Sequence, residues 1–220
     1  GKRALYLSVL EEMDRQLGKL FRYIRNSKAL RENTLVLICS DNGPEKGAGV
    51  AGPFRGFKTH LYEGGIRSSL IAWGPGFVEK SNHVNRSSVF SAIDLVPTIL
   101  DVANVSHPEG VTFDGESLSE VLLGKESSSR EGAIFFRRPP DRDSFYGVSD
   151  LPDLAVRDGK WKFLCEYDGS SPELYDINVD RGETTNLAPA HTKVVARLTK
   201  SLLAWHHSMP ADKGAEYVRN

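Results

Sequence analysis

The arrangement of hydrophobic and polar positions along the chain predicts its helices and strands. Residues 34–39 and 69–73 are short, mostly apolar runs. Such runs are typical of strands covered on both faces, as in a parallel sheet. Between residues 4 and 25, by contrast, apolar side chains recur every three or four positions, which predicts an amphipathic helix. The apolar positions of this helix are Leu10, Met13, Leu17, Leu20, Phe21 and Ile24.

Glycine and proline divide the rest of the first half. Residues 43–66 contain seven glycines and two prolines, so this segment is predicted to be a loop between the two strands. Residues 94–103 predict a helix in which Pro97 occupies the first turn, where its missing N–H costs no hydrogen bond. The order helix, strand, long loop, strand, helix indicates the α/β fold class.

The pattern changes near the serines at 127–129. Asp158-Gly159 lies between two apolar runs and is a strong signal for a two-residue hairpin turn. The last periodic stretch, residues 189–207, predicts a helix. Short strands are expected at residues 133–136, 154–157, 161–165 and 173–177. We therefore predict an α/β part over residues 1–126 and a small antiparallel sheet with a C-terminal helix over residues 127–220.

Composition excludes several classes of protein. The chain has 220 residues, 40% of them hydrophobic and 26% charged, with a net charge of −1. This length can bury a substantial core, and the charge balance predicts neither disorder nor a nucleic-acid surface. No apolar run approaches the roughly 20 residues of a membrane-spanning helix. The widely separated Cys39 and Cys165 predict no disulfide framework.

Candidate chemistry lies where the first predicted strand ends. Asp41 and Asn42 follow it directly, and ligands of open α/β sheets gather at the carboxyl ends of strands. A carboxylate beside an amide oxygen suits Ca²⁺ or Mg²⁺ better than zinc. Asp-Asn-Gly is also a common turn, in which the aspartate accepts hydrogen bonds from nearby backbone amides. Taken alone, the tripeptide favours the turn.

A second candidate is Lys58, in the glycine-rich loop. A lysine there could bind a tetrahedral oxyanion as a point charge, and Arg55 could add a fork of donors. A solvated loop lysine is the ordinary alternative. His60 lies two residues further along, without a partner at a metal-binding spacing. Glu63 and Arg67 predict an ion pair that holds the loop rather than taking part in chemistry.

These residues lie in the first two of five stretches that follow one another along the chain: NTLVLICSDNG, GPFRGFKTHLYEGGIRSSLIAWGPG, FSAIDLVPTILDVANV, FDGESLSEVLLG and PELYDINVDRGETTNLA. In this order the stretches resemble the sulfatases of the alkaline phosphatase superfamily. The resemblance implies part of an alkaline-phosphatase-like sheet with flanking helices. It implies that Asp41 and Asn42 bind calcium, and that Lys58 contacts the sulfate and assists the leaving oxygen; His60 is a weaker substrate-binding candidate.

Other parts of the family pattern are missing from the chain. The family nucleophile is a formylglycine made from a cysteine or serine in a Cys/Ser-x-Pro-x-Arg motif, which neither Cys39, Cys165 nor any serine matches. The remaining metal-binding and sulfate-binding side chains of the family also precede the segment seen here. The resemblance therefore implies the C-terminal half of a sulfatase. The formylglycine is expected in an N-terminal half, and the 220-residue segment alone is expected to be inactive.

The implied activity is hydrolysis of sugar or aryl sulfate esters with Ca²⁺, or alternatively Mg²⁺. A phosphatase, phosphodiesterase or phosphonate hydrolase of the same superfamily would look similar over these residues, and a non-catalytic fragment is a third interpretation. His83 and residues 135–146 are further candidates for the substrate groove. A periplasmic, secreted or lysosomal location is typical of the family.

Overall fold

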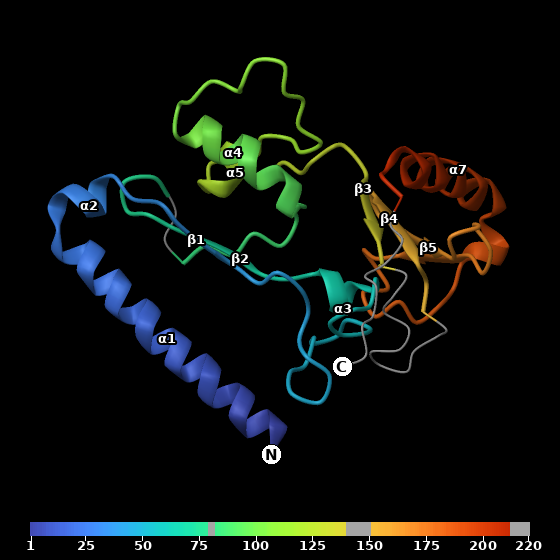
Figure 1. Cartoon of the computed structure of the whole chain (residues 1–220), viewed down its shortest axis with the longest axis horizontal. Helices are drawn as coiled ribbons and strands as arrows, with labels where there is room; N and C mark the ends of the chain where they lie inside the picture. The colour runs from blue at the N-terminus through green and yellow to red at the C-terminus, as the bar shows by residue number, and fades with distance from the viewer. Residues whose placement is uncertain (79–81, 140–150, 212–220) are drawn as a thin grey trace. The chain divides into compact units, whose positions relative to one another are not determined.

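The computed structural model describes residues 1–78, 82–139 and 151–211 (Figure 1). The chain divides into two compact units. The first, here called the site unit, comprises Gly1–Tyr6, Asp41–Ser68 and Ala133–Asn220. The second, here called the helical unit, comprises Leu7–Ser40 and Ser69–Gly132. The predicted division between residues 126 and 127 stays a prediction.

The site unit is built on a four-stranded antiparallel sheet in the order β3-β4-β5-β6. All four predicted strands are confirmed within a residue or so at each end. Asp158 pairs with Trp161, so a two-residue turn joins β4 to β5, and Gly159 adopts a φ of +56° that an L-residue rarely takes. The bounds are β3 Ile134–Arg137, β4 Leu154–Asp158, β5 Trp161–Cys165 and β6 Glu173–Asp176.

Helix α7 (Thr192–Ser208), preceded by the 3₁₀ turn η3 (Ala188–Ala190), covers one face of this sheet (Figure 1). The predicted terminal helix is therefore confirmed, with a slightly later start. The core beneath it is aliphatic and aromatic. Its buried members are Leu154, Val156, Phe163, Cys165, Leu174, Ala188, Leu198 and Leu202.

The opposite face of the sheet is covered by the glycine-rich loop. Leu61 and Tyr62, which directly precede the short helix α3 (Glu63–Ile66), are buried against this face. Because side chains alternate along a strand, α7 and the loop occupy opposite faces of the same four strands. The sheet residues in this second cluster are Ala155, Leu164 and Tyr175. The sheet thus supports the segment that carries the candidate site residues.

The helical unit contains a hairpin-like strand pair and several helices. Strands β1 (Val36–Cys39) and β2 (Leu70–Trp73) run antiparallel, with Val36 opposite Trp73. The prediction of strands covered on both faces, as in a parallel sheet, is therefore wrong for these two strands. Their residues are half-buried or exposed, and an apolar run carries no information on the direction of the partner strand. Helix α1 (Lys2–Asn26) enters this unit from the site unit and contacts β2 where Phe21 meets the edge of Trp73, with ring centroids 4.8 Å apart. Helix α2 spans Lys28–Glu32.

A buried acid organises the rest of the helical unit. The 3₁₀ turn η1 (Ala92–Asp94) leads into α4 (Leu95–Val102), which confirms the predicted helix, and α5 (Ser119–Leu122) packs beside it. Asp94 is fully buried, closes a capping box with Ser91 and forms a 2.6 Å ion pair with Arg130. This carboxylate therefore ties the loop after α5 to the start of α4.

Truncating a residue between sheet and helix should destabilise the site unit. Leu202 of α7 is completely buried, so Leu202→Ala leaves a cavity and should lower the free energy of unfolding by about 2–5 kcal/mol. Val179 is 84% exposed, and Val179→Ala should change the same quantity by less than about 0.5 kcal/mol. Chemical denaturation of both variants checks this, and equal effects would contradict the core assignment.

Candidate functional site

Backbone hydrogen bonds connect Asp41 and Asn42 to the loop that carries Lys58. Asp41 is exposed just beyond the end of β1. The N–H of Gly43 donates to the carbonyl of Gly65 at 2.8 Å, and the N–H of Lys58 donates to the carbonyl of Pro44 at 2.9 Å. Pro44, two residues after Asn42, is thus hydrogen-bonded through its backbone to Lys58. The sequence-predicted metal and sulfate residues therefore belong to one folded loop.

Glycines make this close packing possible. A Cβ on Gly43 would lie 1.9 Å from the carbonyl oxygen of Gly64, and a Cβ on Gly65 would lie 2.0 Å from that of His60. Contacts this short leave no room for any side chain, because neither neighbouring group is a flexible side chain. The Asp-Asn-Gly turn and the Glu-Gly-Gly segment are therefore packed backbone to backbone.

The backbone beside Lys58 is strained. Thr59 has a φ of +80°, a conformation that is costly for a β-branched residue. Its hydroxyl oxygen is buried, and so are both imidazole nitrogens of His60; among the described residues none of these three atoms has a hydrogen-bond partner. Strain and unsatisfied polar atoms concentrate at functional sites. The Lys58-Thr59-His60 segment is thus the part of the loop with the clearest signs of a functional constraint.

His60 is neutral at pH 7. Burial, reinforced by the nearby positive charges of Lys46, Arg138 and Arg55, lowers the pKa of its imidazole to about 4. Its ring packs on Phe57 with centroids 4.0 Å apart. His60 can therefore contribute a neutral donor and acceptor, or simply fill space, but it adds no positive charge to an anion site.

The side chain of Lys58 has a different environment. It is exposed, and no acid among the described residues lies within ion-pair distance of its ammonium group. A lysine with this freedom can meet an anionic ligand as a point charge. Arg55, the other predicted anion contact, is engaged elsewhere: it donates to the Tyr175 hydroxyl at 2.9 Å and lies 3.3 Å from a Glu173 carboxylate oxygen.

Arg55 also borders a shallow hollow on the site unit. Its guanidinium lies 3.8 Å from the ring centre of Tyr62, a cation–π geometry. The hollow has a volume of about 560 Å³ and opens broadly to solvent. It is lined by Pro53, Phe54, Arg55, Gly182, Glu183 and Thr184. Because Glu173 already neutralises Arg55, the hollow offers no free cation to an anionic ligand.

A buried charge cluster lies behind the loop. Glu63, the first residue of α3, is 1% exposed, and its carboxylate lies 3.1 Å from the ammonium of Lys162 on β5 and 3.3 Å from Arg67. Burial alone would raise the pKa of Glu63, but Lys162, Arg157 and Arg67 together lower it below its ordinary value. The predicted Glu63–Arg67 pair is confirmed, with Lys162 as the closer partner.

Glu183 completes the cluster from the segment after β6. One of its carboxylate oxygens accepts the N–H of Glu63 at 2.8 Å, and the other lies 3.7 Å from Lys162. Burial raises the pKa of Glu183 to about 7, although the attraction of Lys162 opposes this rise. Neither Lys162 nor Glu183 was predicted from the sequence. Lys162 looks like an ordinary surface charge in an alternating strand, and Glu183 looks like one next to a turn.

The donors present suit a hard divalent cation but are too few to hold one. Asp41 and Asn42 supply carboxylate and amide oxygens, the chemistry that Ca²⁺ and Mg²⁺ prefer. Calcium takes about 6 to 8 oxygens, and among the described residues there is no group of three or more His, Cys, Asp or Glu side chains placed to bind a metal. The pair thus fits as part of a metal site only.

Three other sequence-based expectations concern residues away from this loop. His83 is exposed in the helical unit, and residues 140–146 of the predicted groove segment lie outside the described residues. Cys39 and Cys165 are both free thiols. In the part of the chain that the structure describes, every helix is too short or too polar to cross a membrane.

Known proteins resemble the chain in both sequence and structure. Residues 1–105 match the family model described as Sulfatase. Arylsulfatase K of Mus musculus is 32% identical over 205 residues, covering 91% of this chain and 35% of the mouse protein. Arylsulfatase A of Homo sapiens is 34% identical over 204 residues, covering 81% of this chain and 38% of the human protein. The chain thus spans little more than a third of these relatives.

Solved structures confirm the fold class. A crystal structure of Ps i-CgsB in complex with k-i-k-neocarrahexaose matches 97% of this chain and 45% of that protein, with a TM-score of 0.81 and 24% identity. The phosphonate monoester hydrolase SpPMH from Silicibacter pomeroyi matches 96% of the chain and 42% of that protein, with a TM-score of 0.65 and 26% identity. The chain has a mixed α/β fold of the alkaline-phosphatase-like type. Within that class, its residues 1–105 match the sulfatase family and the two relatives described above are arylsulfatases, in agreement with the resemblance of its motifs.

The packing at Gly43 predicts a sharp difference between two glycine substitutions. Gly43→Ala has no space beside Gly64, so it should displace the Asp41–Asn42 turn and lower the free energy of unfolding by about 2 kcal/mol or more. Gly18 lies within α1, with only the flexible Arg22 within 4 Å. Gly18→Ala should instead stabilise by about 0.5–1 kcal/mol through helix propensity. Thermal or chemical denaturation checks both signs; a neutral Gly43→Ala would contradict the backbone contact.

Glu183 predicts a measurable pH dependence of stability. Its pKa in the folded protein is about 7, above the ordinary 4.5, so the folded state holds the proton more tightly than the unfolded state. The resulting stabilisation is complete below about pH 4.5 and is lost as the pH rises through 7. Glu183→Gln removes this pH-dependent loss. The free energy of unfolding of the variant should therefore rise relative to that of wild type by on the order of 2 kcal/mol between pH 5 and pH 8.

Groups that titrate in both proteins, including His60, contribute equally to the pH dependence of both, so their effect cancels in the difference between Glu183→Gln and wild type. The exposed Glu11→Gln serves as the control and should show no such gain. Denaturation midpoints at pH 5, 6, 7 and 8 provide the measurement. A Glu183→Gln variant whose stability followed that of wild type over this range would contradict the assigned protonation.

Proposed function

We propose that the complete protein hydrolyses sulfate esters, and that this chain supplies Asp41 and Asn42 as metal ligands and Lys58 as a sulfate-binding residue. The observation that carries the proposal is the hydrogen bond from the Lys58 N–H to the Pro44 carbonyl. It joins the hard oxygen pair and the unneutralised lysine in one loop. A sulfatase needs this combination, because a divalent cation and a lysine together offset the charge of a bound sulfate.

The proposed chemistry assigns separate tasks to the residues of this loop. A bound Ca²⁺, or alternatively Mg²⁺, would polarise the sulfate oxygens. Lys58 would stabilise negative charge on the ester oxygen as its bond to sulfur breaks. His60 is the weaker candidate, and its neutral imidazole could donate or accept a hydrogen bond from the substrate alcohol. A formylglycine from another part of the protein would supply the attacking oxygen.

The partners of this chain follow from the same proposal. The sulfate ester, of a sugar or of an aryl alcohol, is the substrate, and the remaining calcium ligands and the nucleophile come from an N-terminal half. Several apolar side chains of α1 support a further covering segment, since Leu10, Met13 and Leu20 are exposed although their spacing is that of a buried face. The 220-residue segment alone is expected to have no activity.

A second candidate function is hydrolysis of a phosphate ester or a phosphonate. The match to a phosphonate monoester hydrolase at 26% identity favours it as the alternative. The same loop would serve either reaction, because sulfate and phosphonate groups are both tetrahedral oxyanions. The nucleophile motif separates the two: a formylglycine consensus predicts the sulfatase, and an unmodified serine or threonine predicts most of the phosphorus hydrolases. A chain with neither would be a non-catalytic fragment.

Replacing the loop residues should abolish turnover without unfolding the protein. In the complete protein, Lys58→Ala and Asp41→Ala should each lower kcat/KM for a sulfate ester by about 10²-fold or more, because each removes charge stabilisation of the transition state. Steady-state kinetics with 4-nitrophenyl sulfate and with sulfated sugars provide the measurement. Adding a chelator to wild type should produce a comparable loss that Ca²⁺ reverses.

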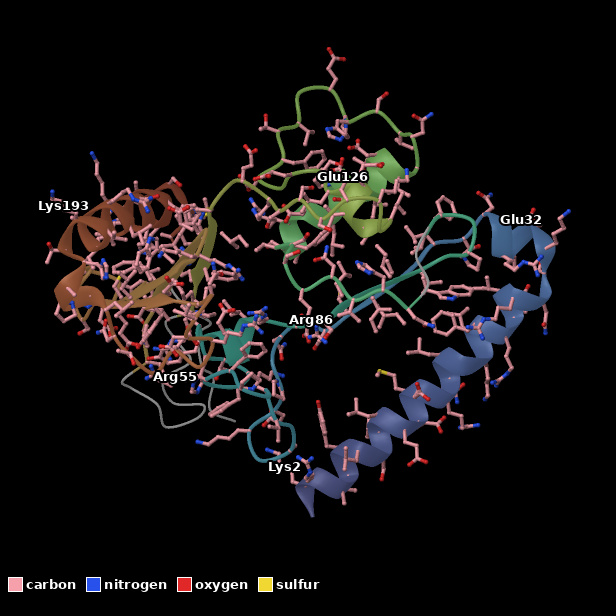
Figure 2. All side chains as sticks on the ribbon, turned by 180° about the vertical axis from the view of Figure 1, so that it is seen from behind. Lys2, Glu32, Arg55, Arg86, Glu126 and Lys193 are labelled. Carbon is pink, nitrogen blue, oxygen red and sulfur yellow. The ribbon has the colours of Figure 1, made fainter. Side chains whose placement is uncertain are left out.

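Lys193→Ala is the matched control. Lys193 is an exposed lysine on α7, pointing away from the sheet (Figure 2). Its removal should leave kcat/KM within about twofold, as expected for a surface substitution away from any site. Unchanged turnover in Lys58→Ala and Asp41→Ala would rule out the assignment. Faster hydrolysis of 4-nitrophenyl phosphate or of a phosphonate ester than of any sulfate ester would favour the alternative function.

A further inference from the structure

Helix α3 is held in place by two residues from later in the chain, one on strand β5 and one in the segment after β6. Lys162 of β5 is completely buried, and its ammonium lies 3.1 Å from one oxygen of Glu63. A lysine at zero exposure requires a charged partner, since an isolated buried ammonium would lose its hydration without compensation. Lys162 and Glu63 therefore fix the distance between β5 and the start of α3.

Glu183 makes the second connection. The first N–H groups of a helix have no partner within the helix, and Tyr62, at the position before α3, provides no side-chain cap. The carboxylate of Glu183 accepts the Glu63 N–H at 2.8 Å in its place. Glu183 itself has a φ of +51°, so its backbone is held in an unfavourable conformation at the point where it reaches α3.

Helix α3 in turn fixes the candidate site. The Gly65 carbonyl accepts the Gly43 N–H at 2.8 Å, directly after the Asp41–Asn42 pair. The Gly64 N–H donates to the Arg55 carbonyl at 2.7 Å, three residues before Lys58. The segment that follows Asn42 and the segment that precedes Lys58 are thus both hydrogen-bonded to the two glycines that follow Glu63. A displacement of α3 would move both segments.

We propose that Lys162 and Glu183 are positioning residues, which act through Glu63 and α3 to hold Asp41, Asn42 and Lys58 in their productive arrangement. The proposal rests on the proposed function for the reaction it serves. Neither residue lies on the loop, and neither needs to contact the substrate. The C-terminal sheet thereby becomes part of the catalytic apparatus rather than a separate appendage.

A surface pair on the same hairpin shows what a purely local interaction looks like. Lys160, two residues before Lys162, lies 2.8 Å from Asp176, and its side chain is 48% exposed. Exposed pairs of this kind contribute little, because water already solvates both charges. Lys160 therefore provides a matched control for Lys162 in charge, residue type and strand hairpin.

The test compares backbone exchange with kinetics in the complete protein. Hydrogen–deuterium exchange of residues 41–67, measured without metal or substrate, should be at least tenfold faster in Lys162→Met and in Glu183→Leu than in wild type. The kcat for a sulfate ester should fall about tenfold or more with a smaller change in KM, since Lys58 acts on the leaving oxygen in the transition state. Lys160→Met should match wild type in both measurements.

A double variant separates positioning from simple loss of stability. Lys162→Met leaves Glu63 buried without its closest counter-charge and can fail to fold; Glu63→Gln/Lys162→Met removes both charges and restores a compatible interior. If the pair positions the loop, the double variant regains thermal stability while exchange in residues 41–67 stays fast and kcat stays low. Wild-type exchange and wild-type kcat in the double variant would overturn the proposal.

Failure of the proposed function would give a different result. A wild-type protein that hydrolyses no sulfate ester would refute the sulfatase assignment, yet exchange in residues 41–67 would still report whether Lys162 and Glu183 hold the loop. Fast exchange in Lys162→Met and in the double variant would then support the positioning role alone. Unchanged exchange in Glu183→Leu and in the double variant would refute that role whatever the activity.

Discussion

The buried pair between Lys162 and Glu63 is the interaction on which the arrangement of the site unit depends. Both charges are withdrawn from water, and each is the closest counter-charge of the other. Removing one partner of such a pair typically costs about 3–5 kcal/mol. The pair connects a strand of the C-terminal sheet to the helix that follows the candidate loop. The fold of residues 133–139 and 151–208 and the geometry of residues 41–67 are therefore energetically coupled.

This coupling explains how the loop can tolerate its own unfavourable features. A threonine at a φ of +80°, and buried polar atoms that have no hydrogen-bond partner among the described residues, would relax in an isolated loop. They persist only where the surroundings over-determine the conformation. Here the surroundings are the backbone contact of Gly43 with Gly64, the burial of Leu61 and Tyr62 on the sheet, and the charge cluster behind α3.

The sequence predicted most elements, the antiparallel C-terminal sheet and the Glu63–Arg67 pair, but not the direction of the β1–β2 pair or the burial of Lys162 and Glu183. Helix periodicity predicted α1, α4 and α7, and the Asp-Gly signal predicted the β4–β5 hairpin. An apolar run carries no information on strand direction, so the antiparallel β1–β2 pair was missed. Lys162 alternates with Trp161 and Phe163 in the manner of a surface lysine on a half-exposed strand; only the loop folding over that face makes it buried.

The candidate site was found by a different route from the fold. Taken alone, the tripeptide with Asp41 favoured a turn, and Lys58 had the features of an ordinary loop lysine. The order of the sulfatase motifs identified both as candidate site residues. The backbone hydrogen bonds of the loop then showed that they belong to one folded segment. Glu183 lies within the last of these sulfatase-like stretches, but the stretch gave no sign of its role, because its partner is a backbone N–H 120 residues earlier in the chain. Contacts of that kind depend on tertiary structure and have no local signal.

On the proposed function, the number of ligands explains why such support is needed. Calcium takes about 6 to 8 oxygens, and this chain offers Asp41 and Asn42, so the site has to be shared with other parts of the protein. A shared site works only if each contributor is held near its productive geometry beforehand, since ordering a loose loop upon binding would consume part of the binding energy. The rigid connection from β5 through α3 to Gly43 meets this requirement, because it fixes the turn before any ligand is bound.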